Sequence, residues 1–237
     1  MGLPRAILFD LDDTIISAYR RPDLAWNRVT AEFASALAPL APADVAASIV
    51  AHAKVFWDDR ARHKRWRMQL FEARRQVVAA VLAAHTRGDE QLSDAIAGRY
   101  SALRDQEMHL HLGAVETLEA LSERGVRLAL ITNGDGIGQR AKIERFGLAR
   151  HFEHVQIEGE HGFGKPEERA YRHALETLRL AAADVWMVGD NLEWEVEAPQ
   201  RLGIHAVWFD GEGQGLPASS AIRPDRIVTA LPQLLPE

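Results

Sequence analysis

Residues 6–14 read Ala-Ile-Leu-Phe-Asp-Leu-Asp-Asp-Thr, a short apolar run that ends in acidic and hydroxyl side chains. Two later runs end in the same way: residues 128–131 lead into Thr132, and residues 185–188 lead through a glycine to Asp190. Short apolar runs bounded by turn residues are typical of strands in a parallel sheet that is buried on both faces. Because such sheets bind ligands beyond the carboxyl ends of their strands, we expect the three polar clusters to meet at one site.

The chain from Gly113 onward alternates between helical and strand patterns. Helices are expected before Gly125, over about 137–146, over 167–178 and up to 202, and glycines close several of them. Strands are expected at 126–131, 155–157, 185–188, 204–209 and, at an edge, 226–228. This alternation predicts an α/β fold with a Rossmann-like, doubly wound, mainly parallel sheet.

The segment between the first strand and the rest of the sheet has a different character. Residues 22–107 are rich in alanine and arginine, and their apolar side chains recur at helical spacing without a strand signal. Prolines at 39 and 42 and the Gly88-Asp89 pair divide the segment into about four helices. We therefore expect an inserted all-α helical-bundle domain over 17–108, and a core domain over 1–16 and 109–237.

Composition limits the class of protein. The 237 residues are 47% hydrophobic, carry a net charge of −6 and include no cysteine. An acidic total does not favour nucleic-acid binding, and the lack of cysteine excludes disulfides, thiolate metal sites and cysteine nucleophiles. There is no signal-peptide pattern and no run long enough to span a bilayer. The expectation is a soluble cytoplasmic protein, a monomer or homodimer, without a nucleic-acid or membrane partner.

Asp10, Asp12 and Asp190 are candidates for a metal site. An isolated Asp-x-Asp most often just ends a strand, but three carboxylates at neighbouring strand ends repel one another. Each close pair costs roughly 4 kcal/mol at about 4 Å with an effective dielectric near 20. A cation must offset this repulsion, and oxygen ligands with room for water and phosphate favour Mg²⁺.

Thr132, Asn133 and Lys165 are candidates for binding a phosphoryl group. Each has a plainer interpretation, because Asn-Gly is a common turn pair and a loop lysine is usually solvated. Together with helix amino-terminal N–H groups, a hydroxyl, an amide and a lysine can hold phosphoryl oxygens. The substrate expected from this chemistry is a small-molecule phosphate ester.

Four segments, taken in order, resemble the motifs of the haloacid dehalogenase (HAD) superfamily. Residues 9–14 resemble the first motif, 132–134 the second, Lys165-Pro166 the third and 189–191 the fourth. The resemblance covers nearly the whole chain, since in subfamily I members the helical C1 cap is inserted directly after the first motif. Within that branch the chain looks most like phosphoglycolate-phosphatase-type and sugar- or nucleotide-phosphatase-type hydrolases, most of which depend on Mg²⁺.

The resemblance also implies roles for individual residues. Asp10 would be the nucleophile that forms a phospho-aspartate, and Asp12 the acid and base. Thr132, Asn133 and Lys165 would bind the phosphoryl group, with Lys165 also neutralising charge on the nucleophile. Mg²⁺ would be bound by Asp10, by Asp190 and by the backbone carbonyl of Asp12.

The fourth motif departs from the family pattern. Where a second aspartate is usual, this chain has Glu195, which is one methylene longer. Glu195 and Asn191 are candidates for supporting contacts, to a metal-bound water or to Lys165. The plainer alternative is that Glu193, Glu195 and Glu197 only favour a helix start through its dipole.

Several functions stay open at this stage. A phosphomutase or phosphotransferase keeps both early aspartates and differs mainly in what the cap admits. A 2-haloacid dehalogenase resembles the fold but lacks an acid at the position of Asp12, and a non-catalytic binding relative has no need of the constellation. Residues 57–67, dense in basic and aromatic side chains, are predicted either to contact an anionic substrate or to form a solvated helix face.

Overall fold

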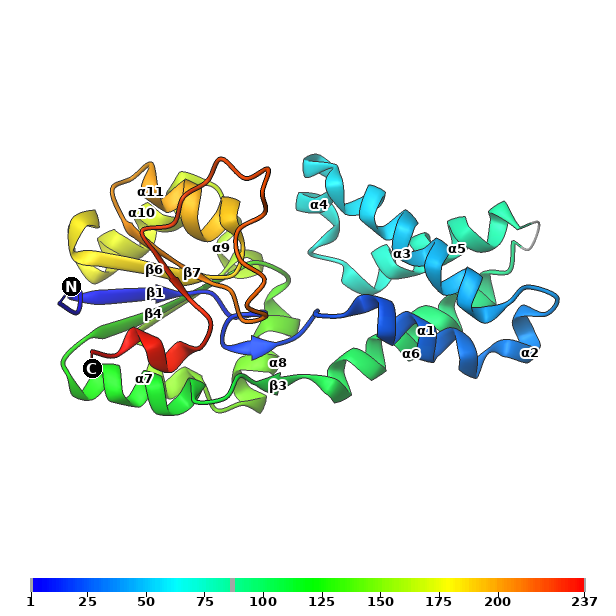
Figure 1. The fold of residues 1–237 in the computed structure, drawn as a ribbon, viewed down its shortest axis with the longest axis horizontal. Helices are drawn as coiled ribbons and strands as arrows, with labels where there is room; N and C mark the ends of the chain where they lie inside the picture. Colours follow the sequence, from blue (N-terminus) through cyan, green and yellow to red (C-terminus); the bar gives the residue numbers. More distant parts are fainter. Residues whose placement is uncertain (1, 86–87, 237) are drawn as a thin grey trace. The chain divides into compact units, whose positions relative to one another are not determined.

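The computed structural model describes residues 2–85 and 88–236 and divides into two compact units. The first, Met1–Ser17 with His109–Glu237, contains the sheet, and the second, Ala18–Met108, is helical. Figure 1 follows the chain as it leaves the first unit after its opening strand and returns to it beyond the helices.

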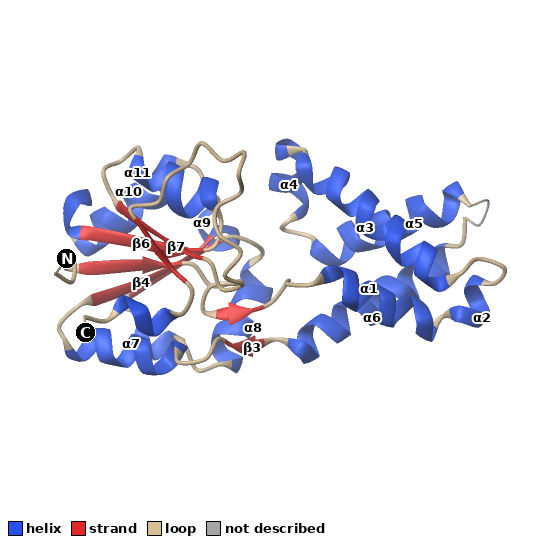
Figure 2. Ribbon diagram, in the orientation of Figure 1, coloured by secondary structure: helices blue, strands red, loops and turns tan. Residues whose placement is uncertain are grey.

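A six-stranded parallel sheet forms the first unit. Its strands follow the order β5-β4-β1-β6-β7-β8, with every neighbouring pair parallel (Figure 2). The predicted Rossmann-like, mainly parallel sheet is therefore confirmed. The strands span β1 Ala6–Phe9, β4 Arg127–Thr132, β5 His154–Ile157, β6 Val185–Gly189, β7 His205–Phe209 and β8 Arg226–Val228.

Helices cover both faces of this sheet, and α7 (Ala114–Glu123) lies on the opposite face from α10 (Glu168–Leu178) and α11 (Ala198–Gln200) (Figure 1). Tyr171 and Ala174 of α10 pack with Leu8 in a fully buried cluster beneath the strands. Burial on both faces explains why the strands are continuous apolar runs rather than alternating ones.

Short elements were not predicted from the sequence pattern. The helix α9 spans only Glu158–His161, and β2 (Ile16–Ser17) pairs with β3 (His109–Leu110) in a two-stranded antiparallel sheet. The expected helix up to 202 begins as a π-helical turn, η3 (Leu192–Glu197), before α11. Elements of two to four residues are too short to show a hydrophobic period.

The second unit is an all-α bundle around one apolar core. Among the described residues of this unit, four long helices match the expected number, and two short ones, α2 and α4, lie between them. The rings of Trp26 and Tyr100 stack in the core with their centroids 3.7 Å apart. Not every apolar side chain of the helical pattern faces this core, since Phe71 of α5 is 48% exposed. The helices span α1 Pro22–Glu32, α2 Ala34–Leu37, α3 Pro42–Asp58, α4 Arg60–Trp66, α5 Leu70–Ala84 and α6 Glu90–Glu107.

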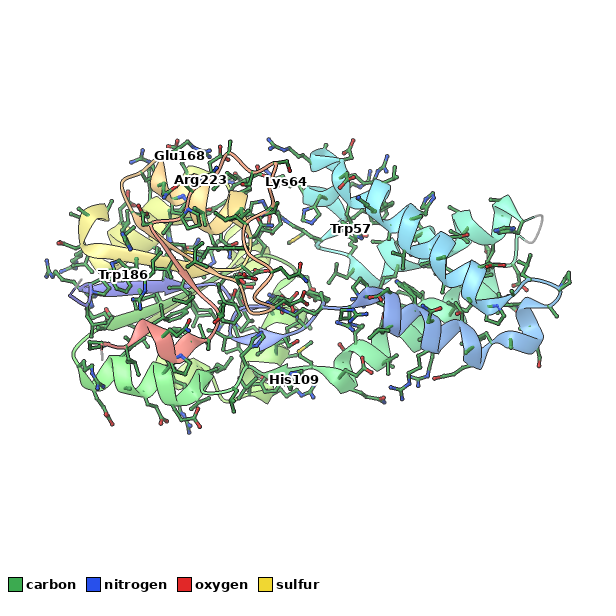
Figure 3. All side chains as sticks on the ribbon, viewed as in Figure 1. Trp57, Lys64, His109, Glu168, Trp186 and Arg223 are labelled. Atoms are coloured by element: carbon green, nitrogen blue, oxygen red, sulfur yellow. The ribbon has the colours of Figure 1, made fainter. Side chains whose placement is uncertain are left out.

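The basic and aromatic run 57–67 is divided between two helices. Trp57 lies near the end of α3 and Lys64 lies on α4 (both labelled in Figure 3), and the Asp59 side chain caps α4 by accepting the backbone N–H of Arg62 at 2.7 Å. Trp57 and Trp66 pack against the core of the bundle, so the aromatic part of the run is structural. Among residues 2–85 and 88–236, no helix is both long and apolar enough to cross a bilayer.

Candidate active site

The carboxyl ends of β1, β4 and β6 bring the predicted residues together. Phe9 lies between Leu130 and Val188 in the parallel register. Asp10 therefore leaves the sheet beside the ends of β4 and β6, where Thr132 and Asp190 follow. The backbone N–H of Asp10 donates to the Val188 carbonyl at 2.9 Å, which continues the sheet up to the first motif.

Lys165 is the centre of a buried ionic cluster. Its side chain is 1% exposed, and its Nζ lies 2.5 Å from Asp10 Oδ1 and 2.7 Å from Glu195 Oε1. Burial alone would lower the pKa of Lys165, but the two carboxylates raise it above its ordinary value. For Asp10 the effect of burial has the opposite sign: it raises the pKa of this carboxyl group, although Lys165 opposes the shift. The Thr14 hydroxyl donates to Asp10 Oδ2 at 3.1 Å, so both carboxylate oxygens have a partner.

The π-helical turn η3 holds Glu195 against Lys165. Glu195 Oε2 accepts the backbone N–H of Asn191 at 2.9 Å, while Oε1 pairs with Lys165. A Cβ at Gly189 would lie 2.0 Å from Glu195 Cγ, so only glycine leaves room for this side chain. Burial raises the pKa of Glu195 to about 7, although Lys165 opposes the shift. Of the alternatives that the sequence left open for Glu195, this geometry favours contact with Lys165.

Asn191 acts on its own helix. Its side-chain Oδ1 accepts the backbone N–H groups of Glu193 and Trp194 at 3.0 and 3.1 Å, which caps the turn that carries Glu195. The contact that Asn191 makes with Glu195 comes from its backbone N–H. Asn191 therefore supports the site through the backbone of η3.

Asn133 joins the second motif to the loop of the third. Its Nδ2 donates to the Lys165 carbonyl at 2.7 Å, and its Oδ1 accepts the Lys165 N–H at 2.8 Å. A Cβ at Gly164 would lie 2.5 Å from Asn133 Oδ1, so this approach also requires glycine. The Asn133 side chain is thus engaged by the Lys165 backbone, which differs from the direct phosphoryl contact expected for it.

Asp12 points toward two residues that the sequence analysis did not single out. Its carboxylate oxygens lie 2.7 and 2.8 Å from Lys142 Nζ, and Gln139 Nε2 donates to Oδ2 at 3.0 Å. Gln139 also donates to Thr132 Oγ1 at 2.5 Å, so it links the first motif to the second. Both residues lie on α8 (Gly136–Arg145), three positions apart on one helix face. The sequence could have indicated both residues, because two polar side chains three positions apart stand in the helix that directly follows the second motif.

Asp190 completes the acidic side of the site. Burial and the charges of Asp10, Glu195 and Asp13 raise the pKa of Asp190 well above its ordinary value. Trp208 Nε1 donates to the Asp190 carbonyl at 2.6 Å and fixes the backbone there. Asp13, at φ 60°, is a further carboxylate that the sequence analysis treated only as part of a turn.

A divalent cation fits this donor set. Asp10, Asp190 and Glu195 bring three carboxyl groups together, and the Lys165 ammonium pairs with only two of them, Asp10 and Glu195. Within residues 2–85 and 88–236, no lysine or arginine forms an ion pair with Asp190. The donors near Asp190 are carboxylate oxygens, which suit a hard ion such as Mg²⁺.

Comparison with known proteins finds a matching family model and several relatives. A family model of the haloacid dehalogenase-like hydrolases matches residues 4–203. A phosphoserine phosphatase of Thermus thermophilus is 46% identical over 87 residues, which cover 37% of this chain and only about a third (35%) of that protein. A glyceraldehyde 3-phosphate phosphatase of Pyrococcus abyssi is 27% identical over 208 residues, covering 86% of this chain and 81% of that protein.

A solved structure shows the same fold over nearly the full length. It is a HAD hydrolase of Bacillus subtilis that was crystallised with magnesium, and it superimposes with a TM-score of 0.74 at 20% identity. The superposition covers 98% of this chain and 97% of that one. At this identity, the likeness concerns the fold.

Proposed function

This chain belongs to the haloacid dehalogenase-like hydrolase family, and on that premise we propose that it is a Mg²⁺-dependent phosphatase acting on a small-molecule phosphomonoester. The observation that carries the proposal is the buried Lys165, bonded at once to Asp10 and Glu195. A lysine that pairs with the attacking carboxylate can neutralise the negative charge of that carboxylate and of the phosphoryl group when the two come together. The phosphatases among the relatives support the same reaction class.

The proposed reaction has two steps. A carboxylate oxygen of Asp10 attacks phosphorus, the bond to the ester oxygen breaks, and Asp12 gives a proton to the leaving alcohol. Asp12 then takes a proton from the water that attacks the phospho-aspartate, which releases phosphate and restores Asp10. Lys142 and Gln139 are positioning residues in this scheme, because they hold the Asp12 carboxylate at the end of β1.

Thr132 and the backbone at Asn133 are the proposed contacts for the phosphoryl oxygens. Thr132 is 2% exposed and its hydroxyl already meets Gln139, so it lies within the same network as Asp12. Mg²⁺, when bound by Asp10, Asp190 and the Asp12 carbonyl, would supply positive charge to the phosphoryl oxygens. We further propose 1–16 with 109–237 as the catalytic core domain, and 17–108 as a cap that selects the substrate.

Phosphate release from a panel of small phosphomonoesters tests the function. The panel is measured with Mg²⁺, with a chelator, and with Asp10→Asn as the blank. Hydrolysis that disappears in both the chelator and the variant supports the proposal. Folded wild-type protein that releases no more phosphate than Asp10→Asn from every ester would contradict it, and transfer of the phosphoryl group to a second alcohol would favour a phosphomutase.

A further inference from the structure

Three histidines of the sheet unit lie together and have no part in the proposed reaction. His154 begins β5, His161 ends α9 and His173 lies within α10, and each side chain is partly buried. One ring nitrogen from each lies within 4.8 Å of those of the other two. Separations of seven and twelve residues gave no motif in the sequence, so only the fold brings them together.

Hydrogen bonds determine which nitrogen of His173 is available. Gln156 donates its Nε2 to the Ala170 carbonyl at 3.0 Å, which leaves Gln156 Oε1 as an acceptor. His173 Nδ1 lies 2.9 Å from that oxygen and must therefore carry the proton. The neutral ring then has its lone pair on Nε2, the form in which imidazole binds a metal.

The same reasoning applies to His161. Its Nδ1 lies 3.1 Å from the Ile157 carbonyl, which can only accept, so Nδ1 carries the proton and Nε2 the lone pair. Metal-binding histidines usually donate their second ring N–H to such an oxygen, which fixes both tautomer and ring orientation. In two rings of the cluster, Nδ1 is thus held by an oxygen acceptor and Nε2 is left with its lone pair.

The third ring completes the group. His154 packs 5.4 Å from the His173 ring, and its Nε2 reaches Gln156 Oε1 only at 3.5 Å, the limit of a hydrogen bond. Burial, aided by the other two imidazoles, lowers the pKa of His154 and so favours the neutral form. Phe163 borders His161 and His173 at 5.8 and 5.5 Å between ring centroids, which gives one side of the cluster an apolar wall.

We propose that His154, His161 and His173 form a binding site for a divalent first-row transition ion, typified by Zn²⁺, that shares no residue with the carboxylate site. Three imidazoles suit Zn²⁺ and its neighbours, whereas Mg²⁺ takes oxygen ligands. Zinc–nitrogen bonds of about 2.0–2.1 Å in a tetrahedron require nitrogens about 3.3 Å apart, so an ion would draw the three rings closer together than the 4.8 Å limit within which their nitrogens lie. Water fills the fourth position.

The placement of the cluster gives the ion a structural consequence. His161 and His173 lie on either side of residues 162–167, the segment that carries Lys165. An ion bound by β5, α9 and α10 would tie this segment to the edge of the sheet. Zn²⁺ should therefore raise the thermal midpoint of the protein, since any ligand that binds only the folded state stabilises it.

Cobalt is the probe for the test, because Co²⁺ in a nitrogen-rich site of low coordination number absorbs strongly in the visible. The untagged full chain, freed of metal, is titrated with Co²⁺ alone, and Zn²⁺ is then added to displace it. His161→Phe and His173→Phe each keep a flat ring but remove the ligand. His151→Phe changes a histidine of the same unit outside the cluster, and Asp190→Asn removes a carboxylate of the proposed Mg²⁺ site.

We expect an intense visible band from Co²⁺ at the histidine cluster in the wild type, in His151→Phe and in Asp190→Asn, and at least tenfold weaker binding by this band in both cluster variants, whereas Co²⁺ at the carboxylate site absorbs only weakly. A wild type without a saturable cobalt band would overturn the proposal. So would a band that both cluster variants retain or that Asp190→Asn abolishes. The absorption of bound Co²⁺ does not depend on catalysis, so this test of the histidine site remains valid even if no phosphatase activity is found.

Discussion

Lys165 is a buried cation between two carboxylates, and its removal would leave both without a partner. We expect Lys165→Met to lower kcat at least about 1000-fold and to reduce stability by roughly 3 kcal/mol, because breaking a buried pair leaves uncompensated charge. Activity is measured as phosphate release and stability by urea unfolding. Adding Glu195→Gln should restore part of the stability and none of the activity. Equal recovery of both would contradict a charge-neutralising role for Lys165.

Gly189 is required by the position of Glu195. A Cβ there would lie 2.0 Å from Glu195 Cγ, so Gly189→Ala must displace the glutamate from Lys165. Overpacking of this kind typically costs about 1–3 kcal/mol, and we expect a matching fall in unfolding free energy together with lower kcat.

Gly98 is the matched control for that substitution. It lies in α6, and a Cβ there meets only Phe71, at 3.9 Å. Gly98→Ala should leave activity unchanged and raise stability by about 0.5–1 kcal/mol, since alanine is the better helix former. A Gly189→Ala protein as stable and active as wild type would show that Glu195 is not held as described.

At the scale of single residues, the sequence could indicate four candidates. Asp10, Asp12 and Asp190 follow apolar runs typical of strands, and Lys165 lies in a segment that resembles the third motif of the family. It could not show that Asn133 bonds to the backbone of Lys165, since that contact joins residues 32 positions apart. Nor could it choose between the two interpretations of Glu195, because the choice depends on the turn geometry of η3 and on the space left by Gly189.

At the scale of elements, α8 gives a clear test, because it presents Lys142 and Gln139 to Asp12. We expect Lys142→Met to lower kcat about 10- to 100-fold with little change in KM, which is less than the roughly 10²- to 10⁴-fold contribution of general acid–base catalysis, because Asp12 itself remains. Lys142→Arg, which keeps the charge, should recover part of that loss. The measurement is steady-state hydrolysis of p-nitrophenyl phosphate.

Arg140→Met is the control on the same helix. Arg140 forms a surface ion pair with Glu160 at 2.7 Å and, in the part of the chain that the structure describes, no hydrogen bond or ion pair joins it to Asp12, so kcat should remain within about twofold of wild type. A similar loss in both variants, or a change confined to KM in Lys142→Met, would mean that Lys142 does not position Asp12.

The long elements were predictable and the short ones were not. Buried runs of four to six residues predict β1, β4 and β6, and helical spacing predicts α1, α3, α5 and α6. In contrast, α9 and the β2–β3 pair have too few residues to produce a period, yet α9 supplies His161 and lies beside the loop of Lys165. The π-helical turn η3 has no distinct sequence pattern, although it determines where Glu195 lies.

At the scale of the whole molecule, the chain consists of two compact units with separate cores, and all proposed Mg²⁺ ligands belong to the sheet unit. Mg²⁺ should therefore raise the thermal midpoint of that unit and leave the unfolding of the helical unit unchanged. A concentration 100 times Kd contributes about 2.7 kcal/mol, which corresponds to a shift of roughly 5–10 °C for a protein of this size. Differential scanning calorimetry with and without Mg²⁺ measures both transitions.

The Asp190→Asn variant distinguishes Mg²⁺ binding at this site from other effects of adding a magnesium salt. The variant removes a carboxyl group whose ionised form is disfavoured by burial and by its carboxylate neighbours, as its raised pKa shows, so the metal-free variant should melt above the metal-free wild type. It should also lose the Mg²⁺ increment, because the amide is a weaker ligand than the carboxylate. These two changes have opposite signs, and a general loss of folding cannot produce both. If the variant instead melts lower without metal and keeps the full Mg²⁺ increment, the cation binds elsewhere and Asp190 has a structural role.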